Sequence, residues 1–157
     1  MFSRVIVTLC AVTWAVGLSG CYSSKDKWEA MRPPVYQVSG MVRMDGEPLS
    51  NAVVVFKPEE GTYSATGLSD ASGQFYLTTF DDRDGAIEGT FQVSVDRVDY
   101  IPIGPEKGTS TDGGTYLPPL KQVRVTPKKY SDFEKSGFAA TVMKDESNSF
   151  EFDLTSN

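Results

Sequence analysis

The residues best suited to metal chemistry are four acids in one short loop, namely Asp81, Asp82, Asp84 and Glu88. Carboxylate oxygens are the ligands that Ca²⁺ prefers. The loop lacks the Asp-x-Asp-x-Asp-Gly spacing of a calcium-binding loop, and Arg83 brings a competing cation into the cluster. We therefore expect a solvated Asp-Gly turn with no metal and no cofactor, and a calcium site at these acids is the alternative.

Catalytic groups are scarce in this chain. It has no histidine among its 157 residues, which removes the commonest general base and metal ligand. It contains no Gly-x-Ser-x-Gly elbow and no glycine-rich phosphate loop. A carboxylate pair for glycoside cleavage is defined by a distance that the sequence does not show. We expect a protein that is not an enzyme.

Its charge also bears on the partner. The formal net charge is −6 and no long basic run is present, whereas nucleic-acid binding requires a clustered basic face. We therefore expect no nucleic-acid partner.

Four aromatic residues offer a binding surface instead. Tyr100, Tyr116, Tyr130 and Phe133 lie close together in a segment rich in proline and glycine. A tyrosine combines an apolar ring with a polar tip, which suits contact with sugars or peptides. They are the candidate ligand loop, and the competing interpretation is that they cover one end of the domain.

The N-terminus has the pattern of an export signal. Arg4 precedes an uncharged apolar run over 5–16, which is too short to span a bilayer comfortably. The sequence Leu18-Ser19-Gly20-Cys21 then resembles the lipobox of bacterial lipoproteins. That resemblance implies cleavage between Gly20 and Cys21 and acylation of Cys21. The alternatives are a plain signal peptide with a chance cysteine, or an uncleaved anchor.

The same resemblance implies a location. A chain carrying several acyl groups is held stably at a membrane, which a single acyl group does not achieve. We expect a lipid-anchored protein of the bacterial cell envelope that faces the periplasm or the cell surface. Tyr22, where an aspartate would resemble an inner-membrane retention signal, favours the outer membrane.

The organisation expected from these signals has three parts. Residues 1–20 form a signal peptide, 21–34 a lipidated cysteine with a flexible tether, and 35–157 an all-β domain. Seven segments alternate apolar and polar residues with the period of a half-buried strand, at 36–44, 52–58, 65–69, 74–79, 90–98, 139–143 and 149–154. A long insertion at about 99–137 is interrupted by prolines, with a short strand expected at 122–125 and a helical turn within 128–136.

The first strands and turns resemble the carboxypeptidase regulatory-like domain. The matching residues are Val38-x-Gly40-x-Val42-x-x-Asp45-Gly46-x-Pro48-Leu49-x-x-Ala52-x-Val54-x-Phe56, followed by Ser69-Asp70-x-x-Gly73-x-Phe75-x-Leu77. The resemblance implies an antiparallel seven-strand Greek-key sandwich of the transthyretin-like (prealbumin) type. The stretch Lys128-Lys129-Tyr130-Ser131-Asp132 is in addition similar to one in small planctomycete envelope lipoproteins.

Fold and anchor together suggest a function. Transthyretin-like hydroxyisourate hydrolases use histidines and a C-terminal Tyr-Arg-Gly-Ser motif, and this chain has neither. We expect a non-catalytic, lipid-anchored module that presents loops to an envelope protein or a glycan. The alternative is a carbohydrate-binding accessory module that uses the loop from Tyr100 to Phe133.

Overall fold

The computed structural model describes residues 27–104, 108–109, 115–116 and 118–157. The chain divides into two units, Met1–Pro33 and Pro34–Asn157. In the described part of the first unit, η1 (Glu29–Met31) is a single 3-10 turn, and the neighbouring Trp28 is exposed. Within the described ranges, no helix has the length and apolar character needed to cross a membrane.

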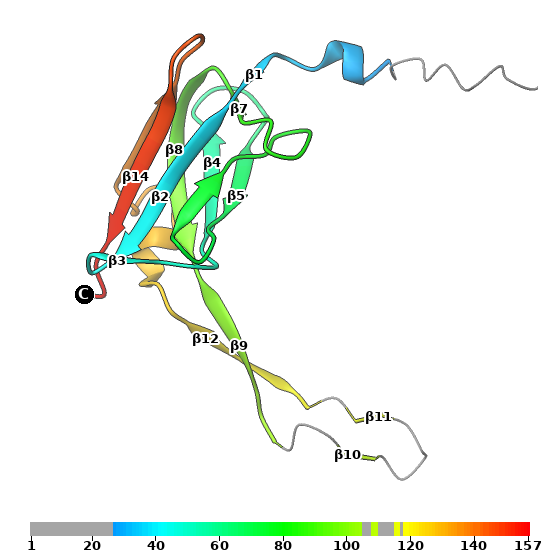
Figure 1. The fold of residues 1–157 in the computed structure, drawn as a ribbon, viewed down its shortest axis with the longest axis vertical. Coiled ribbons are helices and arrows are strands. Elements are labelled where there is room, and N and C mark those ends of the chain that lie inside the picture. The colour runs from blue at the N-terminus through cyan, green and yellow to red at the C-terminus, as the bar shows by residue number, and fades with distance from the viewer. Residues whose placement is uncertain (1–26, 105–107, 110–114, 117) are drawn as a thin grey trace, which may run out of the picture. The chain divides into compact units, whose positions relative to one another are not determined.

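The first sheet of the second unit is built around β2 (Val38–Met44), drawn in cyan in Figure 1. The C-terminal strand β14 (Asn148–Leu154) pairs with one edge of β2 along its whole length. On the other edge, β6 (Gln74–Tyr76) and β3 (Glu47–Pro48) pair with successive parts of β2.

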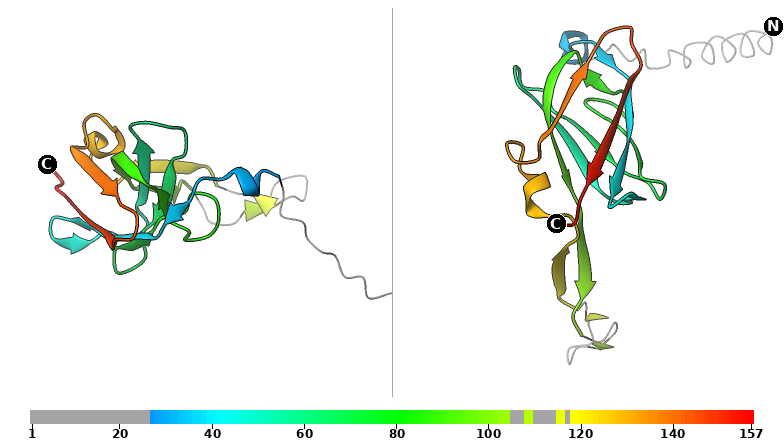
Figure 2. Two further views of the ribbon diagram at one scale, coloured as in Figure 1. Left: turned by 90° about the horizontal axis from the view of Figure 1, so that it is seen from above. Right: turned by 90° about the vertical axis from the view of Figure 1, so that its left-hand side faces the viewer.

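The second sheet has four antiparallel strands. Its order is β13 (Phe138–Val142), β8 (Gly89–Asp96), β4 (Val53–Pro58) and β5 (Ala65–Leu68). The two sheets lie face to face, as the turned views in Figure 2 show. A hydrogen-bonded bridge between Thr66 and Thr78 links β5 to the segment that follows β6.

The core between the sheets is made by the inward positions of the alternating strands. The ring of Phe56 lies at its centre, 5.7 Å from the ring centroids of Phe91 and Phe150 and 6.0 Å from that of Phe152. Tilted and edge-on rings at these distances are favourable beyond the area that they bury. Around them lie further buried side chains, among them Val42, Val54, Leu77, Val93, Val95, Val142 and Leu154.

Several short elements complete the unit. β1 (Val35–Tyr36) pairs with β7 (Ala86–Ile87), and β10 (Gly108–Thr109) pairs with β11 (Thr115–Tyr116). After β8 the chain continues into β9 (Val98–Pro102), which pairs with β12 (Leu120–Arg124) and leaves the two sheets (Figure 1). The 3-10 helix η2 (Lys128–Ser131) then leads towards β13. β12 and η2 correspond to the short strand and the helical turn expected in this region.

The all-β prediction is confirmed for the described residues. The seven alternating segments correspond to β2, β4, β5, β6, β8, β13 and β14. The prediction that every pair is antiparallel is wrong at one place, because β14 runs parallel to β2, with Asn148 beside Val38 and Leu154 beside Met44. Alternation determines which face of a strand is buried but not the direction of its neighbour, so either direction satisfies the pattern.

Candidate functional site

The predicted aromatic ligand loop is not one exposed surface. Tyr130 is only 6% exposed, and its ring stacks on Phe138 with centroids 5.4 Å apart. Its hydroxyl accepts a hydrogen bond from the Thr155 amide at 3.0 Å. Phe133 is half-buried, with the Lys57 ammonium 5.4 Å from its ring centroid. Tyr130 is therefore a core residue rather than a ligand contact.

The other candidates of that loop lie further along the chain. Tyr100, on β9, is 58% exposed, and its hydroxyl accepts a hydrogen bond from the Gln122 side chain at 3.0 Å. Tyr116 belongs to β11, and its side chain is outside the described part. Gly20 and Cys21 also lie outside the described residues.

The acidic loop is organised by Asp84. One of its carboxylate oxygens accepts the backbone N–H of Thr79 at 2.7 Å, and the other accepts those of Phe80 and Asp81, both at 2.9 Å. Partial burial on its own would raise the pKa of Asp84, but the three backbone donors together lower it below its ordinary value. Asp84 thus holds the loop closed by accepting the backbone N–H groups of residues three to five positions earlier in the chain.

The remaining acids of the loop do not converge with Asp84. Asp82 and Glu88 are exposed. Within the described ranges, no three acidic, histidine or cysteine side chains are grouped so that they could hold a metal ion. Three backbone N–H groups already occupy most of the acceptor sites of the Asp84 carboxylate, which leaves it little capacity to bind a cation.

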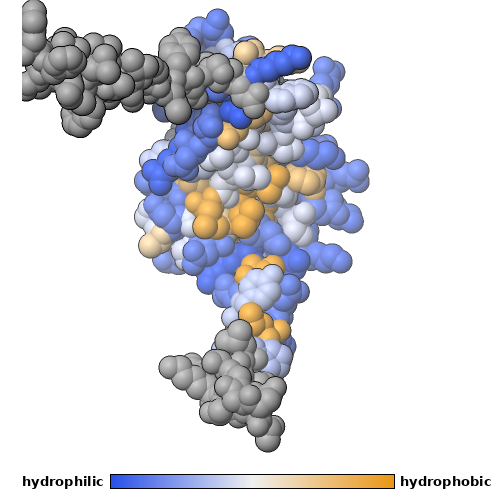
Figure 3. Space-filling view, turned by 90° about the vertical axis from the view of Figure 1, so that its right-hand side faces the viewer, coloured by the Kyte–Doolittle hydropathy of each residue, from blue (hydrophilic) through white to orange (hydrophobic). Residues whose placement is uncertain are grey.

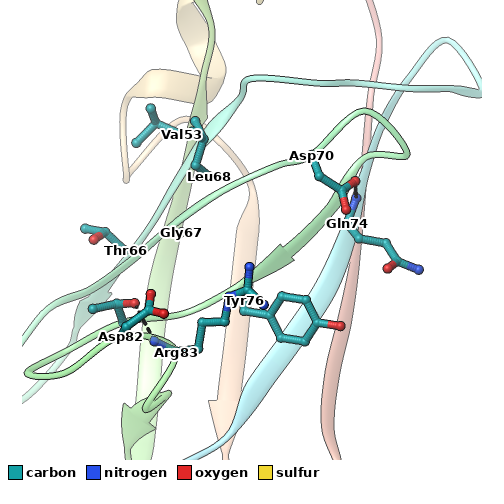
Figure 4. A pocket seen from close by; sticks show the side chains of 10 residues that line it. Val53, Thr66, Gly67, Leu68, Asp70, Gln74, Tyr76, Asp82 and Arg83 are labelled. Carbon is teal, nitrogen blue, oxygen red and sulfur yellow. Dashed lines mark hydrogen bonds between the residues drawn. The ribbon is translucent and has the colours of Figure 1, made fainter.

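An open hollow of about 500 Å³ lies beside this loop, along the outer side of β5 and β6 (Figure 4). Its lining is contributed by β4, β5, β6 and the acidic loop. The lining residues are Val53, Thr66, Gly67, Leu68, Asp70, Gln74, Tyr76, Thr78, Asp82 and Arg83.

One side of the hollow is apolar. Val53 and Leu68 are directly opposed cross-strand neighbours on β4 and β5, and Leu68 is 60% exposed. Their aliphatic side chains point outward because the alternate positions of both strands fill the core. Apolar side chains also gather at the surface of the face shown in Figure 3.

The other side of the hollow is formed by Tyr76 and Arg83. Tyr76 is 46% exposed, and the Arg83 guanidinium lies 5.1 Å from its ring centroid, within cation–π range. The Arg83 backbone has a φ of 55°, and its N–H donates to the Thr78 hydroxyl at 3.0 Å. The loop closed by Asp84 therefore holds Arg83 over the tyrosine ring.

A carboxylate borders the same hollow at Asp70. One oxygen of Asp70 accepts the Ser72 hydroxyl at 2.7 Å and the backbone N–H groups of Ser72 and Gln74 at 2.8 and 3.0 Å. Hydrogen bonding from Ser72 is the main reason why the pKa of Asp70 is lowered. Asp70 is thus an ionised turn residue at the edge of the hollow.

Tyr76 also borders two smaller hollows on the other side of β6. They measure about 260 and 210 Å³ and share Ser39 of β2 with Tyr76. Gln74, Ser149 and Glu151 line the larger of the two, and Asn148 lines the smaller. Tyr76 therefore borders all three hollows, and can contact a ligand that extends from the large hollow into the smaller ones.

This arrangement is equipped for binding. It offers an aliphatic surface, an aromatic ring, a guanidinium with hydrogen-bond donors, and an amide at Gln74. From the sequence alone, Arg83 is only a cation that disfavours calcium binding at the acidic loop, and no motif marks Tyr76 as a functional residue. The available signal was the alternation of residues 74–79, which turns Tyr76 outward next to the inward Phe75 and Leu77.

The comparisons with known proteins add little to this geometry. No family model matches the chain, and no curated protein matches it. Among solved structures, the 9R-lipoxygenase from Cyanothece PCC8801 is similar over 80% of this chain, with 15% sequence identity and a TM-score of 0.31. The chain spans 17% of the length of that protein.

Proposed function

We propose that this chain is a non-catalytic, lipid-anchored binding module of the bacterial cell envelope, and that it recognises a protein partner at the hollow between Leu68 and Tyr76. The observation that carries the proposal is the composition of that hollow. An exposed aliphatic centre, a tyrosine and an arginine, bordered by polar groups, is the composition of a protein–protein interface.

The anchor is supported by the sequence Leu18-Ser19-Gly20-Cys21 after a short apolar run. Lipidation of Cys21 fixes the module at the membrane, with the outer membrane favoured and the domain facing the periplasm or the cell surface. Growth with labelled palmitate tests this: the wild-type chain takes up label and fractionates with membranes, and Cys21→Ser does neither. A Cys21→Ser chain that stays in the membrane fraction would refute the anchor.

The non-catalytic part is supported by the residue inventory. The chain lacks histidine, and both threonine hydroxyls at the hollow belong to residues in the bridge between β5 and the segment after β6. A hydroxyl nucleophile requires a neighbouring base, and the lining residues offer none except the turn carboxylates Asp70 and Asp82.

For the fold, we propose the transthyretin-like Greek key that the turn pattern resembles. The support is the distribution of strands, with β13-β8-β4-β5 facing a sheet in which β2 lies between β14 and β6. Consecutive strands β4 and β5 share one sheet, and the chain then crosses to β6 in the other.

Photo-crosslinking in intact cells tests the partner. A photoreactive amino acid at Leu68 should yield one discrete adduct, and Arg83→Ala in the same chain should reduce its yield several-fold. The matched control is the same probe at Thr141, an exposed position of β13. Equal adducts from both positions, or an Arg83→Ala chain with full yield, would count against the hollow as the binding surface.

A carbohydrate ligand is the second candidate, and the observation in its favour is the exposed ring of Tyr100. The test is a glycan array probed with wild type, Tyr100→Ala and Tyr76→Ala. Wild-type binding that only Tyr100→Ala abolishes would favour the glycan candidate. An array without any bound glycan would remove it.

A further inference from the structure

β9 and β12 form a two-stranded ribbon, and neither outer edge of this ribbon pairs with another described strand. Among the described residues, these two strands pair only with each other. Ile101, Ile103 and Leu120 on this ribbon are all more than half exposed. Two strands alone are marginally stable in water, and a third strand or a packed layer is usually needed. The ribbon is therefore suited to receiving a further strand.

The hydrogen bonds show which backbone groups face outward. The amide of Ile103 donates to the carbonyl of Pro119 at 2.8 Å, and the amide of Val125 donates to that of Arg97 at 2.9 Å. In an antiparallel pair, residues that exchange such bonds alternate with residues whose backbone groups point away from the partner strand. The outward positions are therefore the even-numbered residues of both strands.

The two outer edges differ in what they offer. On β9 the outward positions are Val98, Tyr100 and Pro102, and the proline has no N–H to donate. On β12 they are Leu120, Gln122 and Arg124, each with both a donor and an acceptor. A proline protects an edge strand against further pairing. The open edge is therefore that of β12.

We propose that β12 pairs with β12 of a second copy of this chain. The two strands run antiparallel about a two-fold axis at Gln122, so that two ribbons join into one four-stranded sheet. This is strand addition to an exposed sheet edge, with the same surface contributed by both copies. The new outer edges are the two β9 strands, and Pro102 on each hinders further growth into a fibre.

The register about Gln122 is self-complementary. Leu120 lies opposite Arg124 of the second copy, Lys121 lies opposite Val123, and Gln122 lies opposite Gln122. No two like charges are directly opposed, which is the arrangement that would destabilise a strand pair. The hydrogen bond from Gln122 to Tyr100 is preserved in each copy. The side chains of Tyr100 and Gln122 from both copies would then lie in one row across the four strands.

The charges favour a second copy over an acidic peptide. β12 carries two cations, Lys121 and Arg124. Arg124 is already paired with Asp96 of its own chain, so the ion pairs that an acidic strand could form with β12 are reduced. In the proposed sheet, Lys121 points across Val123 of the second copy towards Asp99, because Val123 and Asp99 are register partners. Asp99 is held in place by Arg97, with contacts of 3.0 and 3.1 Å.

Two proline variants test the proposal. The full chain, purified from membranes in detergent, is measured by size-exclusion chromatography with light scattering corrected for detergent. Wild type should have the mass of a dimer, and Gln122→Pro should have about half that mass. Tyr100→Pro is the matched control and should remain a dimer. Both prolines fall at outward positions, so neither removes a backbone hydrogen bond between β9 and β12. Both variants lose the same side-chain hydrogen bond from Gln122 to Tyr100, so this loss does not distinguish them.

A disulfide assay on intact envelope membranes gives a second readout. Directly opposed residues in an antiparallel pair have Cα atoms about 5 Å apart, within the range for a disulfide. After mild oxidation, Gln122→Cys should form dimers on a non-reducing gel, above the level that wild type gives. Tyr100→Cys should stay at that level. A monomeric wild type, a dimeric Gln122→Pro, or equal crosslinking at both positions would overturn the proposal.

Discussion

At the scale of single residues, two side chains have roles that composition does not reveal. Asp84 belongs to an acidic loop, yet its carboxylate is occupied by three backbone donors. Tyr130 belongs to a proline-rich segment, yet its ring is stacked inside the core. In both cases a polar side chain that looked available for a ligand is used by the fold itself.

Replacing Asp84 should destabilise the domain. Asp84→Asn removes the charge and one acceptor oxygen while the N–H groups of Thr79, Phe80 and Asp81 remain in place. Hydrogen bonds to a charged group contribute about 1.5–3 kcal/mol, so we expect a loss of about 1–3 kcal/mol in the free energy of unfolding. Urea denaturation at neutral pH measures it.

The pH dependence of the stability difference between wild type and Asp84→Asn distinguishes the hydrogen-bonding role of Asp84 from a general effect of surface charge. The pKa of Asp84 is lowered in the folded state, so its contribution is present above the unfolded pKa of about 4 and is lost as pH falls through the folded value. The difference between wild type and Asp84→Asn should therefore shrink in acid. Asp82→Asn, at an exposed position, should change stability by less than about 0.5 kcal/mol at any pH.

Tyr130→Phe tests the buried tyrosine. The change keeps the ring on Phe138 but leaves the Thr155 amide without its acceptor, and should cost about 1–2 kcal/mol of unfolding free energy. Tyr100→Phe removes an equivalent hydroxyl from an exposed ring and should be close to neutral. Equal effects in a thermal unfolding comparison would mean that the Tyr130 hydroxyl does not stabilise the fold.

At the scale of elements, the β2–β14 pair depends on the absence of a side chain at Gly40. A Cβ atom there would lie 2.2 Å from the Phe150 carbonyl oxygen and 2.5 Å from the Phe75 ring. Since the carbonyl belongs to the backbone of the neighbouring strand, it cannot move aside without disturbing the pairing. At Gly40 the two strands and a core ring therefore leave no room for a side chain.

Gly40→Ala should therefore separate β2 from β14. Overpacking of a well-packed core costs about 1–3 kcal/mol and occasionally more, and we expect the upper end of that range. Chemical denaturation gives the free energy. The comparison variant is Ser39→Ala, on the outer side of the same strand, which should be nearly neutral; a Gly40→Ala chain as stable as Ser39→Ala would contradict the geometry.

The sequence predicts the strands well and their partners poorly. Alternation of inward Val38 and Val42 with outward residues, and turns such as Asp45-Gly46, are local signals that place each strand within a few residues. The parallel direction of β14 and the extension of β8 into β9 are set by contacts between distant segments. Pro102 and Pro105 also made the segment after residue 98 look like a loop rather than a paired ribbon.

For the candidate site too, the sequence indicates the single residues but not how they come together. Its individual residues lie at outward strand positions and in a turn, which the pattern indicates. These residues lie around one hollow because a bridge joins Thr66 to Thr78 and because the backbone of Arg83 is left-handed. Both features are visible only in the folded chain.

At the scale of the whole molecule, the last strand completes the first sheet. β14 pairs with all seven positions of β2, from Asn148 beside Val38 to Leu154 beside Met44. Among the described strands, β2 without β14 keeps only its short partners β3 and β6. The rings of Phe150 and Phe152 would also be missing from around Phe56.

A chain that ends after Ser147 should consequently fail to fold. Removing a core phenylalanine costs about 3–5 kcal/mol, and this truncation removes two of them. Their combined loss is comparable to the whole free energy of unfolding of a small domain, which is about 5–15 kcal/mol. Circular dichroism and protease resistance measure the result. Adding a synthetic peptide of residues 148–157 should restore protection, and a truncated chain that resists protease on its own would contradict this reasoning.

The pairing of β14 with β2 has a consequence for the rate of folding. It joins residues that are far apart in the chain, from Asn148 beside Val38 to Leu154 beside Met44. Contacts between distant segments form slowly, because the entropy of closing the intervening chain is lost before the new pairing stabilises it. The meeting of β2 with β14 should therefore be a slow step in the folding of this unit.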